Sequence, residues 1–236
     1  MKKLILTAAM TSLASIAAYA QTPAITWGTP TYISGTSDVS LAGVLAGTWA
    51  PGDSWRGTSV ADNYPVNGVT FTANGSGLFA GITQTGINDR YNGFANPNTL
   101  DGNYNYLLQT SVYSYGSTIT LNWNGMNPGD TYQLEYWAND GRSGVNARTE
   151  TLIGGGNTSA VLDEGSGTGG TGVGQFILGT FVADSTGEES LTIDGPSPII
   201  TLLQIRDITP VPEPSTFALL GGGLCMMLAG FRRKKA

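Results

Sequence analysis

The residues with which this chain could do chemistry are carboxylates and aromatic side chains, because it contains no histidine. Its 236 residues include 17 Asp and Glu residues and a single Cys. Without imidazole, neither a Ser-His-Asp nor a Cys-His nucleophile can form, and no metal site can use histidine. The chemistry that remains is carboxylate catalysis, cation binding through oxygen atoms, and stacking of a ligand on aromatic rings.

Aromatic residues in expected loops are candidates for a sugar-binding surface, because sugar rings stack on flat aromatic faces while Asp, Asn and Arg bind hydroxyl groups. Two pairs, Tyr104 with Tyr106 and Tyr113 with Tyr115, have i, i+2 spacing and share a face wherever the segment is extended. The predicted ligand-binding residues are Trp49, Trp55, Arg90, Tyr91, Tyr104 and Tyr106. For Trp123, Tyr132 and Tyr136 we expect a place in the core instead.

Acidic loop residues suit calcium, a hard cation that takes oxygen ligands. We predict no cofactor other than a structural calcium ion, with Asp38, Asp130 and Asp140 as its candidate ligands and the loop residues Asp163 and Glu164 beside them. Solvated surface carboxylates at turns are the alternative interpretation.

Carboxylate catalysis is the enzymatic alternative, because glycoside hydrolysis needs only two carboxyl groups roughly 5 to 10 Å apart. Glu135, Asp140 and Glu150 would approach one another if strands 130–137 and 148–153 pair. Glu135 can equally face solvent from the polar side of its strand. We therefore predict no catalytic residues and no enzymatic activity.

Short strands must position these side chains. Alternating apolar residues predict strands at 117–123 and 130–137, and the turn-rich segment 124–129 between them predicts a hairpin. The inward-facing sets would be Ile119, Leu121 and Trp123 in the first strand, and Tyr132, Leu134 and Tyr136 in the second. Further strands are predicted at 25–33, 39–48, 67–73, 148–153, 158–162, 175–182, 189–193 and 199–208.

This number and spacing of strands predicts one all-β domain across residues 21–210, an antiparallel β-sandwich or jelly roll. The sequence shows no sustained helical periodicity, which would indicate a helical fold, and no internal repeat, which would indicate a β-helix or propeller. Residues 167–172 match G-x-G-x-x-G, but no helix follows to bind a pyrophosphate. Residues 101–105 open like an EF-hand loop, but the glycine and the final glutamate are missing.

The charge of the predicted domain excludes nucleic acid as a partner. Between Gln21 and Pro210 there are five arginines, no lysine and 16 acidic residues, a formal charge of −11. Such a domain repels phosphate backbones.

The first 20 residues resemble a secretory signal peptide. Lys2 and Lys3 precede an apolar stretch, and Ala18 and Ala20 form an A-x-A cleavage pattern. The mature protein is then expected to begin near Gln21 in an oxidising compartment, where its cysteine-free domain has no disulfide to stabilise it.

The C-terminal 26 residues predict a membrane anchor. A motif at 211–215 precedes an apolar run, 217–231, and a basic tail formed by Arg232, Arg233, Lys234 and Lys235. At 1.5 Å per residue, the run spans roughly 22 Å, which is short of the ~30 Å hydrocarbon core and suits a transient anchor in the inner membrane. The basic tail is expected to stay cytoplasmic.

The order of Pro212, Glu213 and Pro214, a short apolar helix and a basic terminus resembles the PEP-CTERM sorting signal of Gram-negative bacteria. The resemblance covers residues 211–236. It implies export, processing near the motif by an exosortase, and a host that makes exopolysaccharide. The strand pattern and composition also resemble exported proteins of this class whose domain is a jelly roll of the carbohydrate-binding-module type.

The combined prediction is an exported protein of the cell surface or extracellular matrix with a non-catalytic role in binding or building exopolysaccharide. The alternatives are a carboxylate-dependent enzyme that acts on polysaccharide, and a structural or adhesive surface protein without a sugar ligand. An exposed aromatic platform would favour binding, and a close carboxylate pair in a groove would favour the enzyme.

Overall fold

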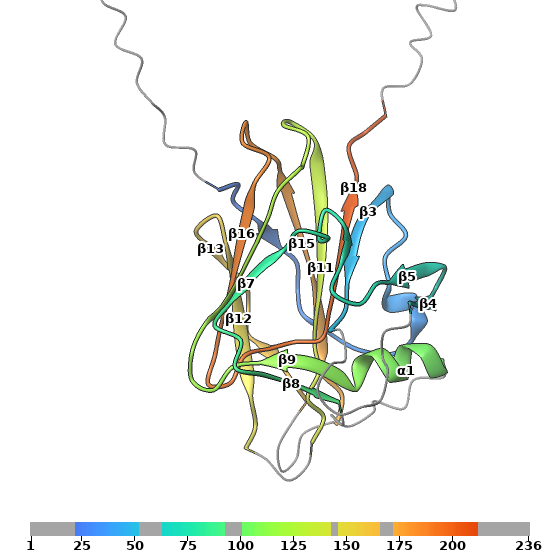
Figure 1. Ribbon diagram of the computed structural model, residues 1–236, viewed down its shortest axis with the longest axis vertical. Coiled ribbons are helices and arrows are strands. Elements are labelled where there is room, and N and C mark those ends of the chain that lie inside the picture. The colour runs from blue at the N-terminus through green and yellow to red at the C-terminus, as the bar shows by residue number, and fades with distance from the viewer. Residues whose placement is uncertain (1–21, 52–62, 93–100, 143–145, 166–171, 212–236) are drawn as a thin grey trace, which may run out of the picture.

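Two antiparallel sheets pack face to face with the apolar side chains of both between them (Figure 1). The computed structural model describes residues 22–51, 63–92, 101–142, 146–165 and 172–211. The larger sheet has the strand order β1 (Thr26–Trp27), β15 (Gln175–Val182), β11 (Thr131–Ala138), β18 (Leu202–Asp207), β3 (Val44–Trp49) and β6 (Ser76–Gly77), with β2 (Thr31–Tyr32) also paired to β15. The facing sheet has the order β13 (Asn157–Thr158), β12 (Thr149–Gly154), β16 (Glu189–Asp194), β10 (Ile119–Trp123) and β7 (Thr83–Thr85), with β14 (Leu162–Asp163) beside β12.

Three smaller elements complete the described fold. A sheet of β17 (Ile199–Ile200), β9 (Thr110–Tyr113) and β8 (Asp89–Asn92) crosses one end of the sandwich. A hairpin of β4 (Tyr64–Val66) and β5 (Val69–Phe71) lies beside the helix α1 (Gly102–Leu108), and a 3-10 turn, η1, covers Thr36–Asp38.

The connectivity confirms the predicted jelly-roll sandwich. From β10 onward the chain alternates between the two sheets, through β10, β11, β12, β15, β16 and β18. Repeated crossing between two packed sheets is typical of a jelly roll.

The predicted hairpin of residues 117–123 and 130–137 was wrong. β10 pairs with β16 and β7, whereas β11 pairs with β15 and β18 in the opposite sheet. The turn-rich segment 124–129 carries the chain from one sheet to the other. This route brings the apolar faces of both strands into one interior, because each sheet turns its apolar side toward the other.

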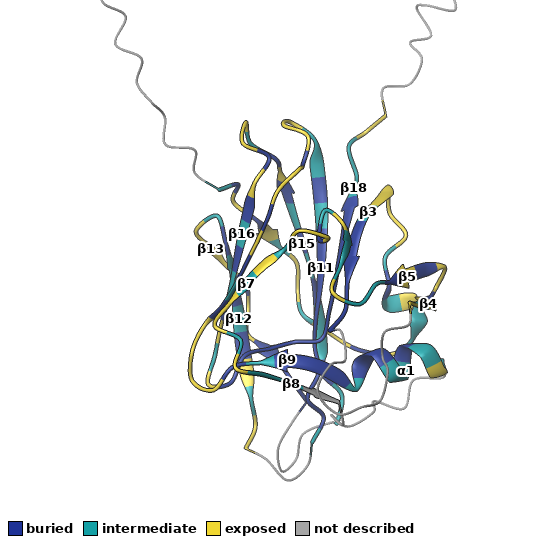
Figure 2. Ribbon diagram, viewed as in Figure 1, coloured by how far each residue is buried: buried dark blue, intermediate teal, exposed yellow. Residues whose placement is uncertain are grey.

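The interior contains the side chains that alternation predicted to point inward. The six predicted residues, Ile119, Leu121, Trp123, Tyr132, Leu134 and Tyr136, are all at most 3% exposed. Figure 2 shows the same buried strands in the middle of both sheets.

A second core lies on the outer face of the larger sheet, where α1 and the β4–β5 hairpin cover part of β11. Trp137 packs edge-on against Phe71, with ring centroids 5.6 Å apart, and its indole N–H donates to the Tyr104 hydroxyl at 2.9 Å. β11 is therefore buried on both faces toward its C-terminal end.

Both ends of the described chain leave the sandwich at the same end, opposite the β8–β9 strands and α1 (Figure 1). Among the described residues, no helix is long and apolar enough to span a membrane. The apolar run at 217–231 lies outside that part of the chain.

Candidate functional site

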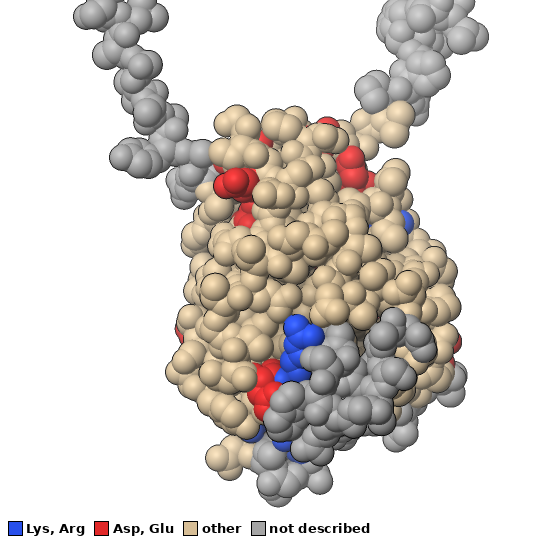
Figure 3. All heavy atoms as spheres, in the orientation of Figure 1, with Lys and Arg blue, Asp and Glu red and all other residues tan. Residues whose placement is uncertain are grey.

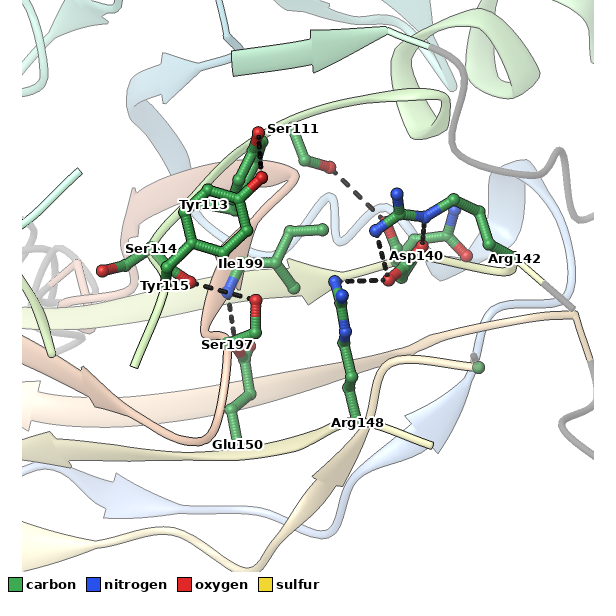
Figure 4. Close-up of polar contacts among 12 residues, drawn as sticks. Ser111, Tyr113, Ser114, Tyr115, Asp140, Arg142, Arg148, Glu150, Ser197 and Ile199 are labelled. Atoms are coloured by element: carbon green, nitrogen blue, oxygen red, sulfur yellow. Dashed lines mark hydrogen bonds and ion pairs between the residues drawn. The ribbon is translucent and has the colours of Figure 1, made fainter. Parts of the chain in front are cut away.

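A pair of tyrosines occupies the surface of the small sheet, at the end of the sandwich away from the termini (Figures 1 and 4). Tyr113 ends β9 and Tyr115 follows it, with ring centroids 5.0 Å apart and ring planes at 81°. Tyr115 is 67% exposed. The pair is one of the two i, i+2 pairs singled out in the sequence, and here the extended backbone does place both rings on one side.

Hydrogen bonds fix this pair on its strand. The two hydroxyl oxygens lie 3.1 Å apart, and the Tyr113 hydroxyl donates to Asp89 Oδ2 at 3.3 Å. Asn88 Oδ1 accepts from the Tyr115 amide and, at 3.0 Å, from the Ser114 hydroxyl. Burial, the Tyr115 hydroxyl and the Asp89 charge raise the pKa of Tyr113, so its hydroxyl remains a neutral donor. We call Asn88, Asp89, Tyr113 and Tyr115 the tyrosine platform.

Sequence reasoning missed Asn88 and Asp89. Asp89 is the direct partner of Tyr113 across the β8–β9 pair. The segment around β8 lacks an alternating apolar pattern, so nothing in it predicted a strand opposite the tyrosines.

Two of the predicted ligand-binding aromatic residues are core residues, which corrects that prediction. Trp49 and Tyr104 are both 0% exposed, so neither ring can meet a ligand. Trp49 ends β3 inside the sandwich, where alternation along a central strand turns it inward.

The remaining predicted binding residues are dispersed. Half-buried Tyr106 packs on Tyr64, with ring centroids 5.0 Å apart. Arg90 adjoins Asp89 in β8, and its Nη1 donates to Asn74 Oδ1 at 3.2 Å. Trp55 lies outside the described residues, and so does the side chain of Tyr91.

Tyr104 and Tyr106 do not share a face, because their segment is the helix α1 and is not extended. Asp101 is the N-cap, and its Oδ1 accepts from the Tyr104 amide at 2.8 Å. The aspartate that resembles the start of a calcium loop therefore begins a helix.

Asp140 binds two arginines, which corrects its prediction as a calcium ligand (Figure 4). Its side chain is fully buried. Arg142 donates from Nε to Oδ1 and from Nη2 to Oδ2, the latter at 2.9 Å, and Arg148 donates from Nη1 to Oδ2 at 3.0 Å. Both carboxylate oxygens are thus used by guanidinium groups, and a cation there would meet two positive charges.

Asp38 and Asp130 have local hydrogen-bonding roles. Asp38 accepts from the Ser34 and Gly35 amides at 2.7 and 3.0 Å. Asp130 accepts from Asn127 Nδ2 at 3.0 Å within its turn. Within the described ranges, no group of three or more acidic or cysteine side chains is placed to hold a metal ion.

Glu150 is buried beside the Tyr136 hydroxyl and the Ile199 backbone. The Tyr136 hydroxyl lies 2.7 Å from Glu150 Oε1 and 2.5 Å from the Ile199 carbonyl oxygen, and it has one hydrogen for two acceptors. If the Tyr136 hydroxyl donates to the Ile199 carbonyl oxygen, the hydrogen between this hydroxyl and Glu150 must come from Glu150 Oε1. The other carboxyl oxygen, Oε2, accepts from the Ile199 amide at 2.8 Å. Burial raises the pKa of Glu150 to about 8, in agreement with this count of hydrogens.

The three carboxylates considered for catalysis do not converge. β11 and β12 belong to different sheets, so the pairing that would join Glu135 to Glu150 does not occur. Glu135 lies on the covered outer face of the larger sheet and is 1% exposed, so it does not face solvent. Its Oε2 accepts from the Ser40 amide at 3.0 Å and Gln204 Nε2 at 3.1 Å, and burial raises its pKa to about 8.

Glu164 is a second buried carboxyl group near Glu150. It is 0% exposed, and neither of its side-chain oxygens has a hydrogen-bond partner. Burial, and then the charges of Glu150 and Asp140, raise its pKa well above the ordinary value. The end of the sandwich that bears the tyrosine platform thus encloses carboxyl groups that solvent does not reach.

The predicted terminal signals lie outside the described residues. These are Ala18, Ala20, Pro212, Glu213, Pro214, Arg232, Arg233, Lys234 and Lys235. Residues 210–235 nevertheless match the family model of the PEP-CTERM protein-sorting motif. The chain carries a PEP-CTERM sorting motif. It is therefore an exported protein that an exosortase-type enzyme sorts to the cell surface or beyond, and the match says nothing of the sandwich.

Solved structures share only a distant likeness with the chain, and no curated protein matches it. An exo-β-1,3-galactanase from Phanerochaete chrysosporium matches at 16% identity and a TM-score of 0.32, over 53% of this chain and 27% of the galactanase. A family GH115 4-O-methyl-α-glucuronidase matches at 11% identity and a TM-score of 0.31, over 52% of this chain and 18% of the other. The catalytic domain of a GH87 α-1,3-glucanase matches at 12% identity and a TM-score of 0.28, over 57% of this chain and 28% of the glucanase. At these values the likeness carries no inference about ligand or activity.

Proposed function

We propose that this PEP-CTERM protein is a non-catalytic surface protein that binds the exopolysaccharide of its host through the tyrosine platform. The observation that carries the proposal is the exposed, hydrogen-bonded Tyr113–Tyr115 pair beside Asp89. An aromatic ring offers a sugar its flat face, and the carboxylate and amide next to it can bind hydroxyl groups.

The rigidity of the platform supports this role. The hydrogen bonds of Tyr113 to Asp89 and of the Tyr115 amide to Asn88 hold the segment before a ligand arrives. A ligand that binds a pre-ordered surface loses less conformational entropy than one that must order it.

The position of the platform also suits a protein attached by its C-terminus. In the proposed precursor, an N-terminal signal peptide ending at Ala20 directs export, and residues 217–231 hold the chain in the inner membrane until processing. The chain after β18 leaves the sandwich at the end opposite β8 and β9 (Figure 1). A chain anchored through residues 212–236 would present the platform away from the membrane.

Support for a non-catalytic role comes from the carboxylates. Glu150 and Glu164 are at most 2% exposed, and Asp140 is neutralised by two arginines. A general acid or nucleophile must reach the glycosidic bond, and these groups lie beneath the surface.

Co-sedimentation of the purified protein with the exopolysaccharide of its host, with and without calcium, tests the proposal. We expect saturable pelleting in both conditions, because the platform needs no ion. Protein that stays in the supernatant throughout would contradict the proposal and favour a structural or adhesive role. Release of reducing sugar ends during the assay would favour the carboxylate-dependent enzyme.

A further inference from the structure

An exposed apolar loop leads into β3 at the end of the sandwich where both chain ends leave (Figures 1 and 2). Its five residues, 41–45, read Leu-Ala-Gly-Val-Leu, and all five are exposed. Leu41 is 56% exposed, Val44 69% and Leu45 40%. Contiguous exposed aliphatic side chains are unfavourable in water and mark a surface that a partner or a membrane covers. We call residues 41–45 the apolar loop.

The apolar loop lies directly beside the point where the chain leaves β18. Val44 is the strand partner of Asp207, the last residue of β18. Gly43 has a φ of +60°, and a Cβ atom there would lie 2.0 Å from the Asp207 carbonyl oxygen, so the turn of the loop is pressed against the end of β18. Val211, four residues further on, is 85% exposed and is the last described residue. The loop and the outgoing chain therefore share one end of the larger sheet.

A short connection to the apolar run at 217–231 keeps this end close to the membrane in the proposed precursor. Five residues, 212–216, separate Val211 from the run. The six Cα–Cα steps from Val211 to Phe217 span at most roughly 20 Å in a fully extended chain. The headgroup layer takes up about 5–7 Å of that distance. The loop is thus tethered within reach of the lipid surface, and tethering raises its effective concentration there.

The backbone of the apolar loop is already hydrogen-bonded from the protein side. Arg206, which is 7% exposed, donates from Nε to the Ala42 carbonyl and from Nη2 to the Gly43 carbonyl at 3.3 Å. The Ala42 amide donates to Ser40 Oγ at 3.3 Å. Backbone groups that leave water without a partner oppose insertion into lipid, and these three groups have partners. The loop can therefore enter a headgroup layer without losing its shape.

The charges around the loop favour a lipid surface without net negative charge. Asp207 is the partner of Val44, and Asp184 and Glu188 lie at the same end, in the turn between β15 and β16. Figure 3 shows acidic groups near both outgoing chain ends. Of the described arginines, Arg206 is the one at this end, and it is buried under the loop. Anionic headgroups would repel this end, whereas zwitterionic lipid allows the aliphatic side chains to insert.

We propose that the apolar loop inserts into the headgroup region of a zwitterionic bilayer while residues 217–231 hold the chain in the membrane. Lipid surrounds a loop tip that enters this layer, so neighbouring side chains that point in opposite directions, such as Val44 and Leu45, both meet lipid. The inference rests on the proposed membrane-held precursor and not on the tyrosine platform. This contact would orient the sandwich with β8 and β9 away from the lipid (Figure 1).

Fluorescence quenching in vesicles tests this contact. The chain from Gln21 to Ala236, with Cys225→Ala, is labelled with a polarity-sensitive fluorophore at Val44→Cys and reconstituted in phosphatidylcholine vesicles that contain headgroup spin-labelled lipid as the quencher. We expect the emission at position 44 to shift to shorter wavelength and to be strongly quenched. Both effects should weaken when phosphatidylglycerol replaces part of the lipid. A label at Ser185→Cys, exposed in the acidic turn at the same end, should remain in water.

Leu41→Ser in the chain labelled at position 44 should reduce the quenching, because it removes an aliphatic side chain from the loop. Unquenched emission at position 44, in a chain that floats with the vesicles in a density gradient, would overturn the inference and leave the membrane-held precursor standing. A chain that does not float with the vesicles would overturn both.

Three further outcomes would overturn the inference. These are quenching that Leu41→Ser leaves unchanged, equal quenching at positions 44 and 185, and quenching that strengthens with phosphatidylglycerol. A shift that grows with protein density in the bilayer, without quenching, would replace the lipid by a second copy of the chain. All these readouts are independent of exopolysaccharide binding.

Discussion

At the scale of single residues, the hydrogen bonds of Tyr136 make Glu150 a structural acid. Glu150→Gln keeps a donor toward the Tyr136 hydroxyl and an acceptor for the Ile199 amide, so we expect a loss of less than about 1 kcal/mol in the free energy of unfolding. Glu150→Ala removes both hydrogen bonds and leaves a cavity, which should cost about 2–4 kcal/mol. Urea denaturation at pH 6 measures both. An equally large loss in both variants would show that the ionised carboxylate is the stabilising form.

Single residues also show where sequence pattern stops being informative. Alternation correctly predicts that Tyr132 and Tyr136 point inward, because their strand has one clear apolar face. It cannot tell that the segment at Ser40 crosses the opposite face and covers Glu135. Nor can it separate Trp49 from Tyr115, since both are aromatic residues near glycines and only the tertiary structure determines which of them is covered.

At the scale of elements, the helix α1 depends on its N-cap. Asp101→Ala removes the acceptor for the Tyr104 amide and should lower the free energy of unfolding by about 1 kcal/mol. Asp101→Asn is the matched control, because asparagine caps helices about as well and should retain most of the stability. Urea denaturation of the three proteins at one pH is the measurement. If Asp101→Asn loses as much stability as Asp101→Ala, Asp101 stabilises the protein through its negative charge and not as an N-cap.

The sequence predicts the bounds of a strand best where the strand is long and pairs over its whole length with a long neighbour. The strand predicted at 175–182 is β15 residue for residue, and all eight of its residues pair with the long strand β11, whereas β1 and β2 on its other side pair with two residues each. The partners of β10 and β11 were not predictable from the turn between them. A turn of six residues can close a hairpin or cross to the facing sheet, and here burial of two apolar faces decided the outcome. The two-residue strand β6 owes its pairing to its longer neighbour β3.

At the scale of the whole molecule, buried glutamates should make the domain more stable in mild acid. Glu135 and Glu150 have pKa values of about 8 in the folded protein against an ordinary value of 4.5. Between these values the folded state binds protons that the unfolded state has lost, so stability falls as pH rises from about 4.5 to 8. Each group can contribute up to about 1.4 kcal/mol per pH unit.

Thermal unfolding at pH 5, 7 and 9 tests this dependence. We expect the midpoint to be highest at pH 5, and a variant combining Glu135→Gln with Glu150→Gln to show a weaker decline toward pH 9. A midpoint that rises from pH 5 to pH 9 would mean that these carboxyl groups are ionised in the folded protein.

The central claim for the molecule is that the tyrosine platform binds exopolysaccharide, and the affinity of Tyr115→Ala tests it most directly. Tyr115 is 67% exposed, so its loss should leave the fold intact while removing a stacking face. Val161→Ala, at a site that is 60% exposed directly before β14 and outside the tyrosine platform, is the matched control. In equilibrium co-sedimentation we predict roughly tenfold weaker binding for Tyr115→Ala and wild-type binding for Val161→Ala. Equal affinities for all three proteins would contradict the account.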